Sequence, residues 1–331
     1  MSEGAPGAQV KTYAHHALMP GNGHAAPAVS VIVPANGRLP TLERCLSAIN
    51  SARTADDELI VVDAAGSSPA GARNDGADAA SHAILVFVDS DVEVRPNALS
   101  LIRQRFAADP ALAAVFGSYD DEPHEQDVVS TFRNLPHHYV HQGAAGTVDS
   151  FWTGLGAVRR SAFAEAGGFD TGFAWPSVED IEFGARLRAT GRIQLDPAIQ
   201  GKHLKRWTLA RMVQTDLVKR GIPWTRLALR GRATRSELNL AWPHRLSAVV
   251  SVTFALSLAR RRLAAAAGSL GILCVLNGPF YRLLWRRGGR HLVAGVALHV
   301  IHHLTSVLAF VVGAVGIRGT SRREEQGGGM R

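Results

Sequence analysis

Two aspartates stand one residue apart directly after a short apolar run. Residues 84–88 read Ile-Leu-Val-Phe-Val, and Asp89, Ser90 and Asp91 follow. Such a run is typical of a parallel strand inside an α/β sheet, and ligands collect at the carboxyl ends of these strands. Carboxylates placed there suit a hard divalent cation that leaves coordination positions free for phosphate oxygens. Asp and Ser are also common in plain acidic turns, so the neighbouring residues must decide between the two interpretations.

A third aspartate falls at the end of another apolar run. Residues 58–63 read Glu-Leu-Ile-Val-Val-Asp, so Asp63 closes the run, and small residues follow it. In a parallel sheet this end lies beside Asp89, where a carboxylate can accept hydrogen bonds from a nucleobase or a ribose. Arg73 follows within a short predicted helix. It is expected either to brace a diphosphate or the aspartates, or to be a solvated helix residue.

Alternating strands and helices are predicted to position these residues. Short apolar runs predict the strands, and apolar residues at helical spacing predict the helices between them. The links are short, which is typical of a parallel sheet with helices on both faces. The predicted strands are residues 29–34, 58–63, 84–88 and 113–118, and the predicted helices are residues 41–53, 70–80 and 95–108. Residues 120–136 are polar and are expected to be irregular.

Charge divides the 331-residue chain, whose formal net charge is +8, into an acidic and a basic part. Residues 1–201 hold 14 Lys and Arg against 24 Asp and Glu, whereas residues 202–244 hold 10 against 2 and residues 245–331 hold 12 against 2. The arginines of the basic part flank long uncharged apolar runs, which is typical of membrane segments rather than of nucleic-acid binding. We therefore expect membrane lipids, and no nucleic acid, as partners.

The apolar runs predict a membrane region of two or three helices over residues 236–317. A crossing needs about 20 apolar residues, so the first run is short and the third is ample. Segment 202–235 is basic and amphipathic, as suits a membrane surface. Residues 1–27 are expected to be a disordered leader rather than a signal peptide, and residues 318–331 a basic, glycine-rich tail. The three runs are residues 246–259, 263–280 and 291–317.

Seven short motifs resemble, in their order and spacing, those of family 2 glycosyltransferases with the GT-A fold. The resemblance covers roughly residues 29–210, and the ordered set rather than any single motif carries it. It implies an α/β GT-A domain, which we assign to residues 28–235, and the C-terminal membrane helices expected from the apolar runs follow this domain. The motifs are Val-Ile-Val-Pro (31–34), Val-Val-Asp (61–63), Ala-Arg-Asn-Asp-Gly-Ala (72–77), Val-Asp-Ser-Asp (88–91), Phe-Trp-Thr-Gly-Leu-Gly-Ala-Val-Arg-Arg (151–160), Gly-Gly-Phe-Asp (167–170) and Glu-Asp-Ile-Glu-Phe (179–183).

The resemblance further implies a nucleotide-sugar donor bound with Mg²⁺ or Mn²⁺. Pro34, Ala35 and Asp63 would hold the nucleoside. Asp89 and Asp91 would hold the metal and the diphosphate, with Asp91 the more direct ligand. The metal would stabilise the charge that develops on the leaving diphosphate. This chain has Asp-Ala-Ala-Gly-Ser where the family commonly has Asp-Gly-Ser, so the nucleobase preference is less defined, and UDP is the expected nucleotide.

Inversion at the anomeric carbon, also implied by the resemblance, requires a base on the acceptor side. Asp180 matches the family's general base, a carboxylate that accepts the proton of the acceptor hydroxyl. Glu179 is the competing carboxylate and is assigned to the acceptor site together with Trp152 and Gly154. Acidic residues at a helix N-terminus also interact favourably with the helix dipole, and both interpretations can hold together.

The segment Gly-Lys-His-Leu-Lys-Arg-Trp at residues 201–207 follows the base by about the distance at which this fold returns to the metal. His203 is a candidate third metal ligand, because imidazole accepts Mn²⁺; the alternative is a structural histidine. Arg206 and Trp207 resemble an Arg-Trp signature that closes the active site of processive members. They would neutralise the diphosphate and stack on an acceptor sugar, or else be an interfacial tryptophan beside snorkelling cations.

The sequence therefore predicts an enzyme that is anchored to the cell membrane, by a hairpin or several crossings, with its catalytic domain in the cytoplasm. It would transfer a sugar to a lipid-linked or other glycan acceptor. A processive polysaccharide synthase is the alternative enzyme, although the Gln-x-x-Arg-Trp motif is incomplete. A non-catalytic nucleotide-sugar-binding membrane scaffold is the alternative from another class, and retention of Asp89, Asp91 and Asp180 argues against it.

Overall fold

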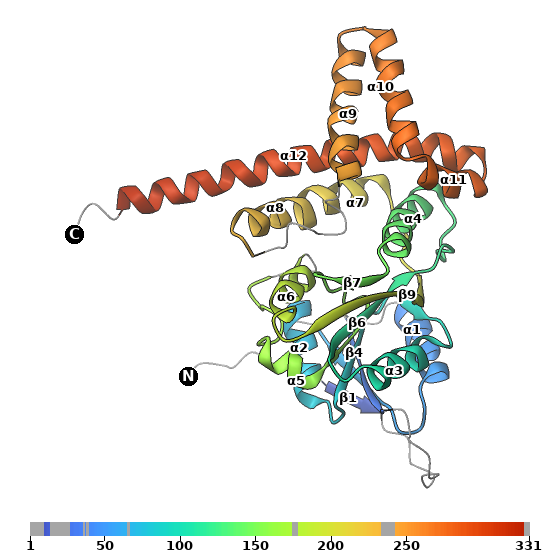
Figure 1. Cartoon of the computed structure of the whole chain (residues 1–331), viewed down its shortest axis with the longest axis vertical. Helices are drawn as coiled ribbons and strands as arrows, with labels where there is room; N and C mark the ends of the chain where they lie inside the picture. Colours follow the sequence, from blue (N-terminus) through green and yellow to red (C-terminus); the bar gives the residue numbers. More distant parts are fainter. Residues whose placement is uncertain are drawn as a thin grey trace. The chain divides into compact units, whose positions relative to one another are not determined.

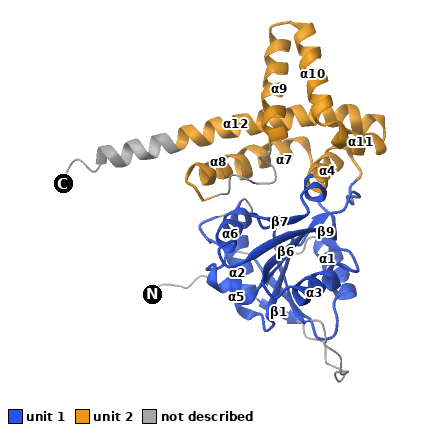
Figure 2. Cartoon of the chain, in the orientation of Figure 1, with its two compact units in different colours: residues 1–125, 140–205 blue, residues 126–139, 206–331 orange. Residues whose placement is uncertain are grey.

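A computed structural model describes residues 10–13, 27–35, 37, 40–64, 67–173, 178–232 and 242–327, with the side chains of 13 and 317–327 left out. The chain divides into two compact units, which are coloured separately in Figure 2. The first unit comprises residues 1–125 and 140–205, and the second comprises residues 126–139 and 206–331. The division at residue 205 differs from the expected boundary near residue 235, because the basic segment packs with the apolar helices rather than with the sheet.

The first unit is built on one mixed sheet (Figure 1). The strands are β1 Val10–Tyr13, β2 Val29–Ala35, β3 Glu58–Asp63, β4 Ile84–Val88, β5 Val92–Val94, β6 Leu112–Tyr119, β7 Gly146–Val148, β8 Leu155–Arg159 and β9 Arg192–His203. Their order is β1-β3-β2-β4-β8-β6-β9-β5, with β7 beside β9. Strands β3, β2 and β4 are parallel as predicted, whereas β8 is antiparallel to both of its neighbours.

Helices cover both faces of this sheet, as the alternating pattern predicted. One face carries α1 Pro40–Ala52 and α3 Ala98–Ala108, whose buried side chains join those of Val31 and Val86 in one core. The other face carries α2 Pro69–Ala79, α5 Arg160–Glu165 and α6 Glu179–Leu187. There Phe87 packs on the rings of Phe163 and Phe169. Val86 and Phe87 point to opposite faces because successive side chains alternate along a strand.

A large bulge divides strand β9 into two parts. Phe116 of β6 pairs with Leu195, yet Ser118 pairs with Gln200, so β9 gains several residues within two residues of β6. Gly117 stands at this point, where a Cβ atom would lie 2.0 Å from the carbonyl oxygen of Ile199. The bulge lets the end of β9 continue beside β6 and also pair with β5, which brings the end of β9 back to the edge where β4 ends.

The second unit is helical. Its elements are the first part of α4 Val128–Gly143, α7 Leu209–Gln214, the π-helix η1 Thr215–Gly221, α8 Ile222–Leu229, α9 Trp242–Ala259, α10 Leu263–Leu276, α11 Gly278–Arg286 and α12 Gly289–Gly327. Helices α9 and α10 form a hairpin, and α12 contacts α9, α11, η1 and α8 (Figure 1). Among the described residues, Gly289–Gly316 is long and apolar enough to cross a membrane, and the bent pair α10–α11 would count as a second candidate.

Three sequence-based expectations differ from the structure. The predicted leader contains strand β1, which pairs antiparallel with β3; residues 1–9 and 14–26 lie outside the described residues. Segment 120–136, which is expected to be irregular, contains the start of α4. The polar residues Ser130, Thr131 and Asn134 hide the helical pattern because they are buried, where apolar residues are expected. The second apolar run is not one helix, because it bends by 82° between α10 and α11.

Candidate functional site

The nucleoside residues predicted from the sequence lie together at the ends of β2 and β3. Ala35 is in register with Asp63, and the backbone N–H of Ala64 donates to the carbonyl oxygen of Ala35 at 2.7 Å. Asp63 is exposed and Pro34 is half-buried. Strand β4, the other neighbour of β2, runs parallel to it and continues into Asp89. The three strands therefore end at one edge of the sheet, as a nucleotide site at parallel strand ends requires.

Arg73 joins two carboxylates that are distant in sequence. Its Nη2 donates to Oδ1 of Asp89 at 2.8 Å, and its Nη1 donates to Oε1 of Glu179 at 2.9 Å. Arg73 and Glu179 are buried, whereas Asp89 is about one-third exposed. Burial by itself would lower the pKa of Arg73, but the charges of Asp89 and Glu179 outweigh it and raise that pKa. Arg73 thus holds Asp89, the first of the two aspartates, and ties it to α6.

This bridge changes the place of Glu179. The sequence assigned Glu179 to the acceptor site, but its carboxylate is only 4% exposed and is engaged by Arg73. Asp180, the next residue in the first turn of α6, is half-buried, and its Oδ1 accepts from the backbone N–H of Ile181 at 2.9 Å. Of the two acids, Asp180 is therefore the more accessible to an acceptor. Residues 174–177, which precede α6, lie outside the described residues.

Asp91 and His203 come together where β5 meets the end of β9. Val92 pairs with His203 across the two strands, and the backbone N–H of Leu204 donates to the carbonyl oxygen of Asp91 at 2.8 Å. As a result, Nε2 of His203 and Nζ of Lys205 each lie 3.9 Å from Oδ2 of Asp91. The ring of Tyr119 stacks on His203 with a centroid distance of 4.4 Å, which fixes the plane of the imidazole.

The predicted metal ligands are only partly assembled. Within the part of the chain that the structure describes, no three His, Cys, Asp or Glu side chains gather into a metal-binding group. Asp89 is held by Arg73, while the 3.9 Å between Asp91 and His203 suits two ligands of one ion, which lie about 3–4 Å apart when each bond is about 2.1 Å long. One oxygen and one nitrogen ligand, completed by phosphate oxygens and water, fit Mn²⁺ or Mg²⁺.

Trp152 and Gly154 form a compact turn before β8. A Cβ atom on Gly154 would lie 2.2 Å from the Trp152 ring, so only glycine fits beneath the indole. The half-buried indole makes edge contacts with Tyr119 at 4.9 Å and with His141 at 5.6 Å between centroids. Tyr119 therefore connects Trp152 of the predicted acceptor site with His203 of the predicted metal site.

Arg206 and Trp207 belong to the second unit. Trp207 is buried in an apolar cluster with Phe132, Met212 and Leu284, and Arg133 lies 5.0 Å from its ring. The expectation that Trp207 stacks on an acceptor sugar does not match this burial. Arg206 is exposed. The Arg-Trp pattern gave no indication that its two side chains would differ in exposure.

Three further residues shape the site. Asn74 holds the backbone of Phe169 with two hydrogen bonds of 2.9 Å, one donated by Nδ2 and one accepted by Oδ1. Tyr119 and Lys205 accompany His203 and Asp91, as described above. In the sequence, Asn74 lies inside the motif of residues 72–77, and Tyr119 directly follows a predicted strand. These two positions were the signals that could have identified them as site residues.

Beneath Asp89, Cys45 is buried, and burial together with Asp91 and Asp89 raises the pKa of its thiol.

The chain resembles known proteins in part of its sequence and in its fold. Residues 65–167 match the family model described as Glycosyl transferase family 2. A mannosyltransferase from Pyrobaculum calidifontis, solved in complex with GDP-Man and Mn²⁺, superposes with a TM-score of 0.52 and 20% identity over 88% of each chain. GalNAc-T7, solved with UDP, GalNAc and Mn²⁺, covers 55% of this chain and 44% of its own, with a TM-score of 0.41 and 14% identity. No curated protein sequence matches the chain significantly.

The expected fold and resemblance are thereby confirmed. The family match begins after β3, ends just after α5 and includes Arg73, Asp89 and Asp91. The superposition covers 88% of the chain. Residues 65–167 therefore match the family 2 glycosyltransferases in sequence, and the chain has the GT-A fold.

Proposed function

We propose that the chain is an inverting, metal-dependent glycosyltransferase that uses a nucleotide-sugar donor and a lipid-linked acceptor at the cytoplasmic face of a membrane. The observation that carries the proposal is the edge of the sheet, where Asp63 ends β3 and Asp89 and Asp91 stand in the turn between β4 and β5. Arg73 links Asp89 to the helix that bears Asp180. Donor-binding groups and a candidate base are thus built into one framework.

Donor binding is assigned to the strand ends. Pro34, Ala35 and Asp63 bind the nucleoside, with UDP as the expected nucleotide. Asp91 and His203 are the residues that would hold a divalent ion together with the diphosphate oxygens, and Mn²⁺ in the superposed mannosyltransferase supports this assignment. When bound, the ion supplies Lewis-acid stabilisation to the leaving diphosphate. Lys205, 3.9 Å from Asp91, adds a positive charge beside the same oxygens.

The proton step is assigned to Asp180. Its carboxylate accepts the proton of the acceptor hydroxyl as that oxygen attacks the anomeric carbon from the face opposite the diphosphate, which inverts the configuration. Glu179 is a positioning residue, because its buried ion pair with Arg73 anchors the first turn of α6. Arg186 anchors the same helix, since it bonds Glu182 and the carbonyl oxygen of Gly168.

A lipid-linked acceptor is supported by the composition of the second unit. That unit combines a helix apolar enough to cross a membrane with a strong excess of arginine. A sugar acceptor carried by a lipid stays in the membrane, so an enzyme that stays there meets it at high local concentration. Transfer to soluble acceptors with no transfer to any lipid acceptor would contradict this part of the proposal.

The test uses the full chain purified in detergent. UDP- and GDP-linked sugars are supplied with Mn²⁺, with Mg²⁺ or with EDTA, first alone and then with a lipid extract. We expect metal-dependent donor hydrolysis and a lipid-borne product. Asp180→Asn should lower transfer by about 10²- to 10⁴-fold and leave nucleotide binding intact, whereas Asp91→Asn should weaken Mn²⁺ binding. Asp78→Asn, an exposed acid of α2, is the matched control. Unchanged transfer by Asp180→Asn would overturn the base assignment.

A further inference from the structure

The longest apolar helix of the second unit has two opposite faces of different character. Because an α-helix has 3.6 residues per turn, the residues of α12 named below for the two faces lie on opposite sides of the helix. One face lies against η1 and α8: Nδ1 of His302 is 2.8 Å from Oδ2 of Asp216, and a Cβ atom on Gly221 would lie 2.5 Å from that of Ala309. The other face carries Val293, Val300, Leu304, Leu308, Val311 and Val315.

The face toward η1 and α8 is unsuited to a bilayer core. His302 stands at the middle of Gly289–Gly316, and its partner Asp216 also pairs with Arg133 of α4 at 2.8 Å. Lys219 and Arg220 are exposed on η1 beside this point. If α12 crossed a membrane, these charges would lie at bilayer depth, where charged side chains are strongly disfavoured.

The opposite face is suited to lipid. Val293, Leu308, Val311 and Val315 are at least half exposed. Val300, which lies on the same face between Val293 and Leu308, packs with Val250 of α9 and Leu273 of α10. The α9–α10 hairpin therefore rises from the apolar face of α12, away from the charged layer of η1 and α8, and Figure 1 shows α12 passing across the base of the hairpin.

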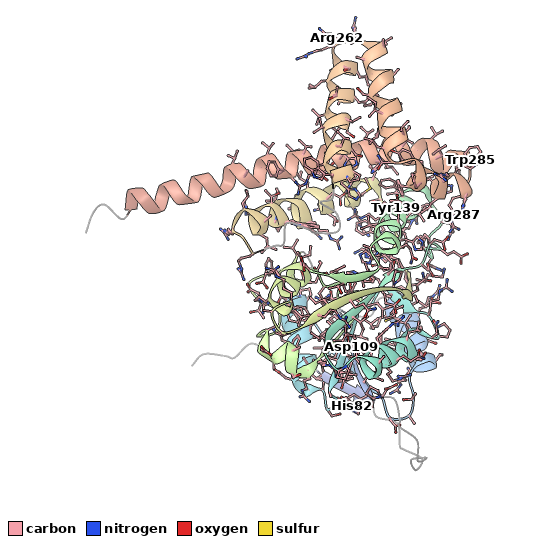
Figure 3. All side chains as sticks on the ribbon, in the orientation of Figure 1. His82, Asp109, Tyr139, Arg262, Trp285 and Arg287 are labelled. Carbon is pink, nitrogen blue, oxygen red and sulfur yellow. The ribbon has the colours of Figure 1, made fainter. Side chains whose placement is uncertain are left out.

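The hairpin has the charge pattern of a crossing, and α9 is close to the required length. Helix α9 has 18 residues and is about 27 Å long, and α10 has 14 residues and is about 21 Å long, against a hydrocarbon core of about 30 Å. No charged residue stands between Arg245 and Arg260, or between Arg262 and Arg282. The three consecutive arginines form the tip, where Figure 3 labels Arg262, while the same figure labels Trp285 and Arg287 beyond the other end.

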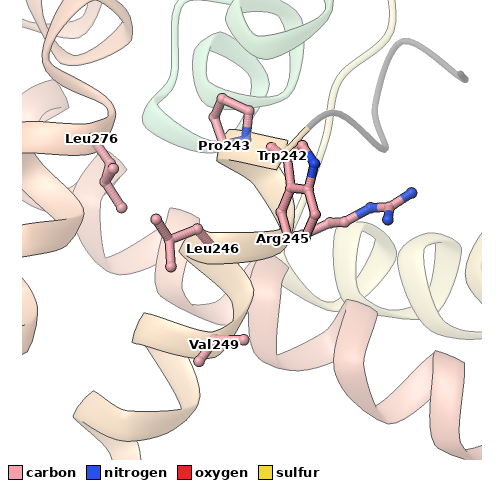
Figure 4. A pocket seen from close by; sticks show the side chains of 6 residues that line it. All are labelled: Trp242, Pro243, Arg245, Leu246, Val249 and Leu276. Carbon is pink, nitrogen blue, oxygen red and sulfur yellow. The ribbon is translucent and has the colours of Figure 1, made fainter.

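The base of the hairpin resembles a headgroup-level anchor. An open apolar groove there is lined by Trp242, Pro243, Leu246, Val249, Leu276 and the stem of Arg245 (Figure 4). Trp242 is 79% exposed, and the Arg245 guanidinium lies 5.6 Å from its ring. Exposed tryptophan beside arginine is typical of the membrane–water interface. No Asp or Glu occurs between residues 238 and 323, which favours anionic lipid headgroups.

We propose that the α9–α10 hairpin crosses the bilayer of an anionic membrane, and that α12 lies along the membrane surface and does not cross it. The arginines of the tip reach the far headgroups, where long side chains extend to water. The inference rests on the membrane attachment in the proposed function and decides which helices cross. It also means that the third and longest apolar run, which lies in α12, does not cross the membrane.

The test locates three introduced cysteines in a Cys274→Ala background; Cys45 is buried and stays. Arg260→Cys marks the tip of the hairpin and Arg287→Cys the end of α11. Val312→Cys marks the far part of α12, at an exposed position on the side of the helix between its two faces. A membrane-impermeant maleimide is applied to sealed right-side-out and inside-out vesicles from expressing cells. We expect Arg287→Cys and Val312→Cys to be labelled from one side of the membrane, and Arg260→Cys to be labelled only from the other side.

Each other outcome overturns the inference. Labelling of Arg287→Cys and Val312→Cys from opposite sides would show that α12 crosses. Labelling of all three from one side would show that the hairpin does not. Release of the chain by carbonate would overturn membrane attachment as well. If Arg260→Cys or Arg287→Cys fails to bind nucleotide, Ala264→Cys or Arg286→Cys, respectively, takes its place. Donor turnover, measured separately, tests the proposed catalysis whichever topology is found.

Discussion

At the residue scale, the buried guanidinium of Arg73 organises the site. Asp89 and Glu179 are 90 positions apart in the chain, yet they bind different nitrogens of one side chain. A buried carboxylate requires a partner, because the interior does not solvate its charge. The pair therefore stabilises the fold and positions the first turn of α6 at the same time.

Arg73→Ala should destabilise the first unit by about 3–5 kcal/mol, the typical cost of removing one member of a buried ion pair. Denaturant unfolding followed by tryptophan fluorescence measures it. Arg44→Ala is the matched control, since Arg44 pairs with Glu93 at 2.6 Å on the surface and such pairs contribute about 1 kcal/mol or less. Equal losses for the two variants would contradict the importance of burial.

At the element scale, η1 is tied to two helices through one acid. Asp216 receives Arg133 of α4 on Oδ1 and His302 of α12 on Oδ2, both at 2.8 Å. Burial opposes ionisation of Asp216, but Arg133 and the hydrogen bond from His302 outweigh it and lower its pKa to about 2. The carboxylate thus holds three separate segments of the second unit in one arrangement.

The pKa of Asp216 predicts acid sensitivity. Its native value lies below the ordinary 3.8, so the native state binds fewer protons than the unfolded state, and stability falls as pH falls from about 5 to 2. Asp216→Asn should cost about 2 kcal/mol at pH 7 and much less near pH 2. Circular dichroism during unfolding at pH 7 and pH 3 measures it, with Glu165→Gln as an exposed control. A difference independent of pH would contradict the assignment.

The bulge in β9 predicts a glycine requirement at residue 117. Gly117→Ala would place a methyl group 2.0 Å from the carbonyl oxygen of Ile199, so a loss of about 1–3 kcal/mol is expected from the forced backbone shift. Gly143→Ala, at the end of α4 with no atom within 4 Å of the new Cβ, should be neutral or slightly stabilising. Urea unfolding compares the two variants. Full stability of Gly117→Ala would show that the bulge can move.

The sequence predicted features that depend on neighbouring residues better than those that depend on distant ones. Strands β3 and β4 were predicted to the residue because their apolar runs are short and bounded, and Asp63, Asp89 and Asp91 followed at their ends. The bond between Arg73 and Glu179 links positions 106 residues apart, so no local pattern indicates it. Trp207 was misread for the same reason, because its burial depends on Phe132 and Leu284.

At the scale of the whole molecule, the acidic and basic parts of the chain coincide closely with the two units. Residues 1–201, with 24 Asp and Glu, fall mostly in the first unit, and the second unit collects most of the arginine. Attraction between exposed charges and a membrane weakens as salt shortens the Debye length from about 10 Å at 0.1 M to about 3 Å at 1 M. Burial of apolar side chains in lipid has no such dependence.

The chain should therefore float with vesicles of phosphatidylcholine and phosphatidylglycerol at both 0.1 M and 1 M salt, with only a modest loss at high salt. Flotation on a sucrose gradient followed by immunoblotting measures the bound fraction. Vesicles of phosphatidylcholine alone control for the contribution of anionic headgroups. Complete release at 1 M salt would indicate that surface charge alone holds the chain.

The double contact of Arg73 has a consequence for how this sequence can change. Because Asp89 and Glu179 share one cation, the effects of replacing them should not add, and a double-mutant cycle should give a coupling free energy of about 0.5–3 kcal/mol. A substitution at one carboxylate alters the charge balance seen by the other. We therefore expect positions 73, 89 and 179 to co-vary among related sequences, so that three positions scattered along the chain behave as one inherited character.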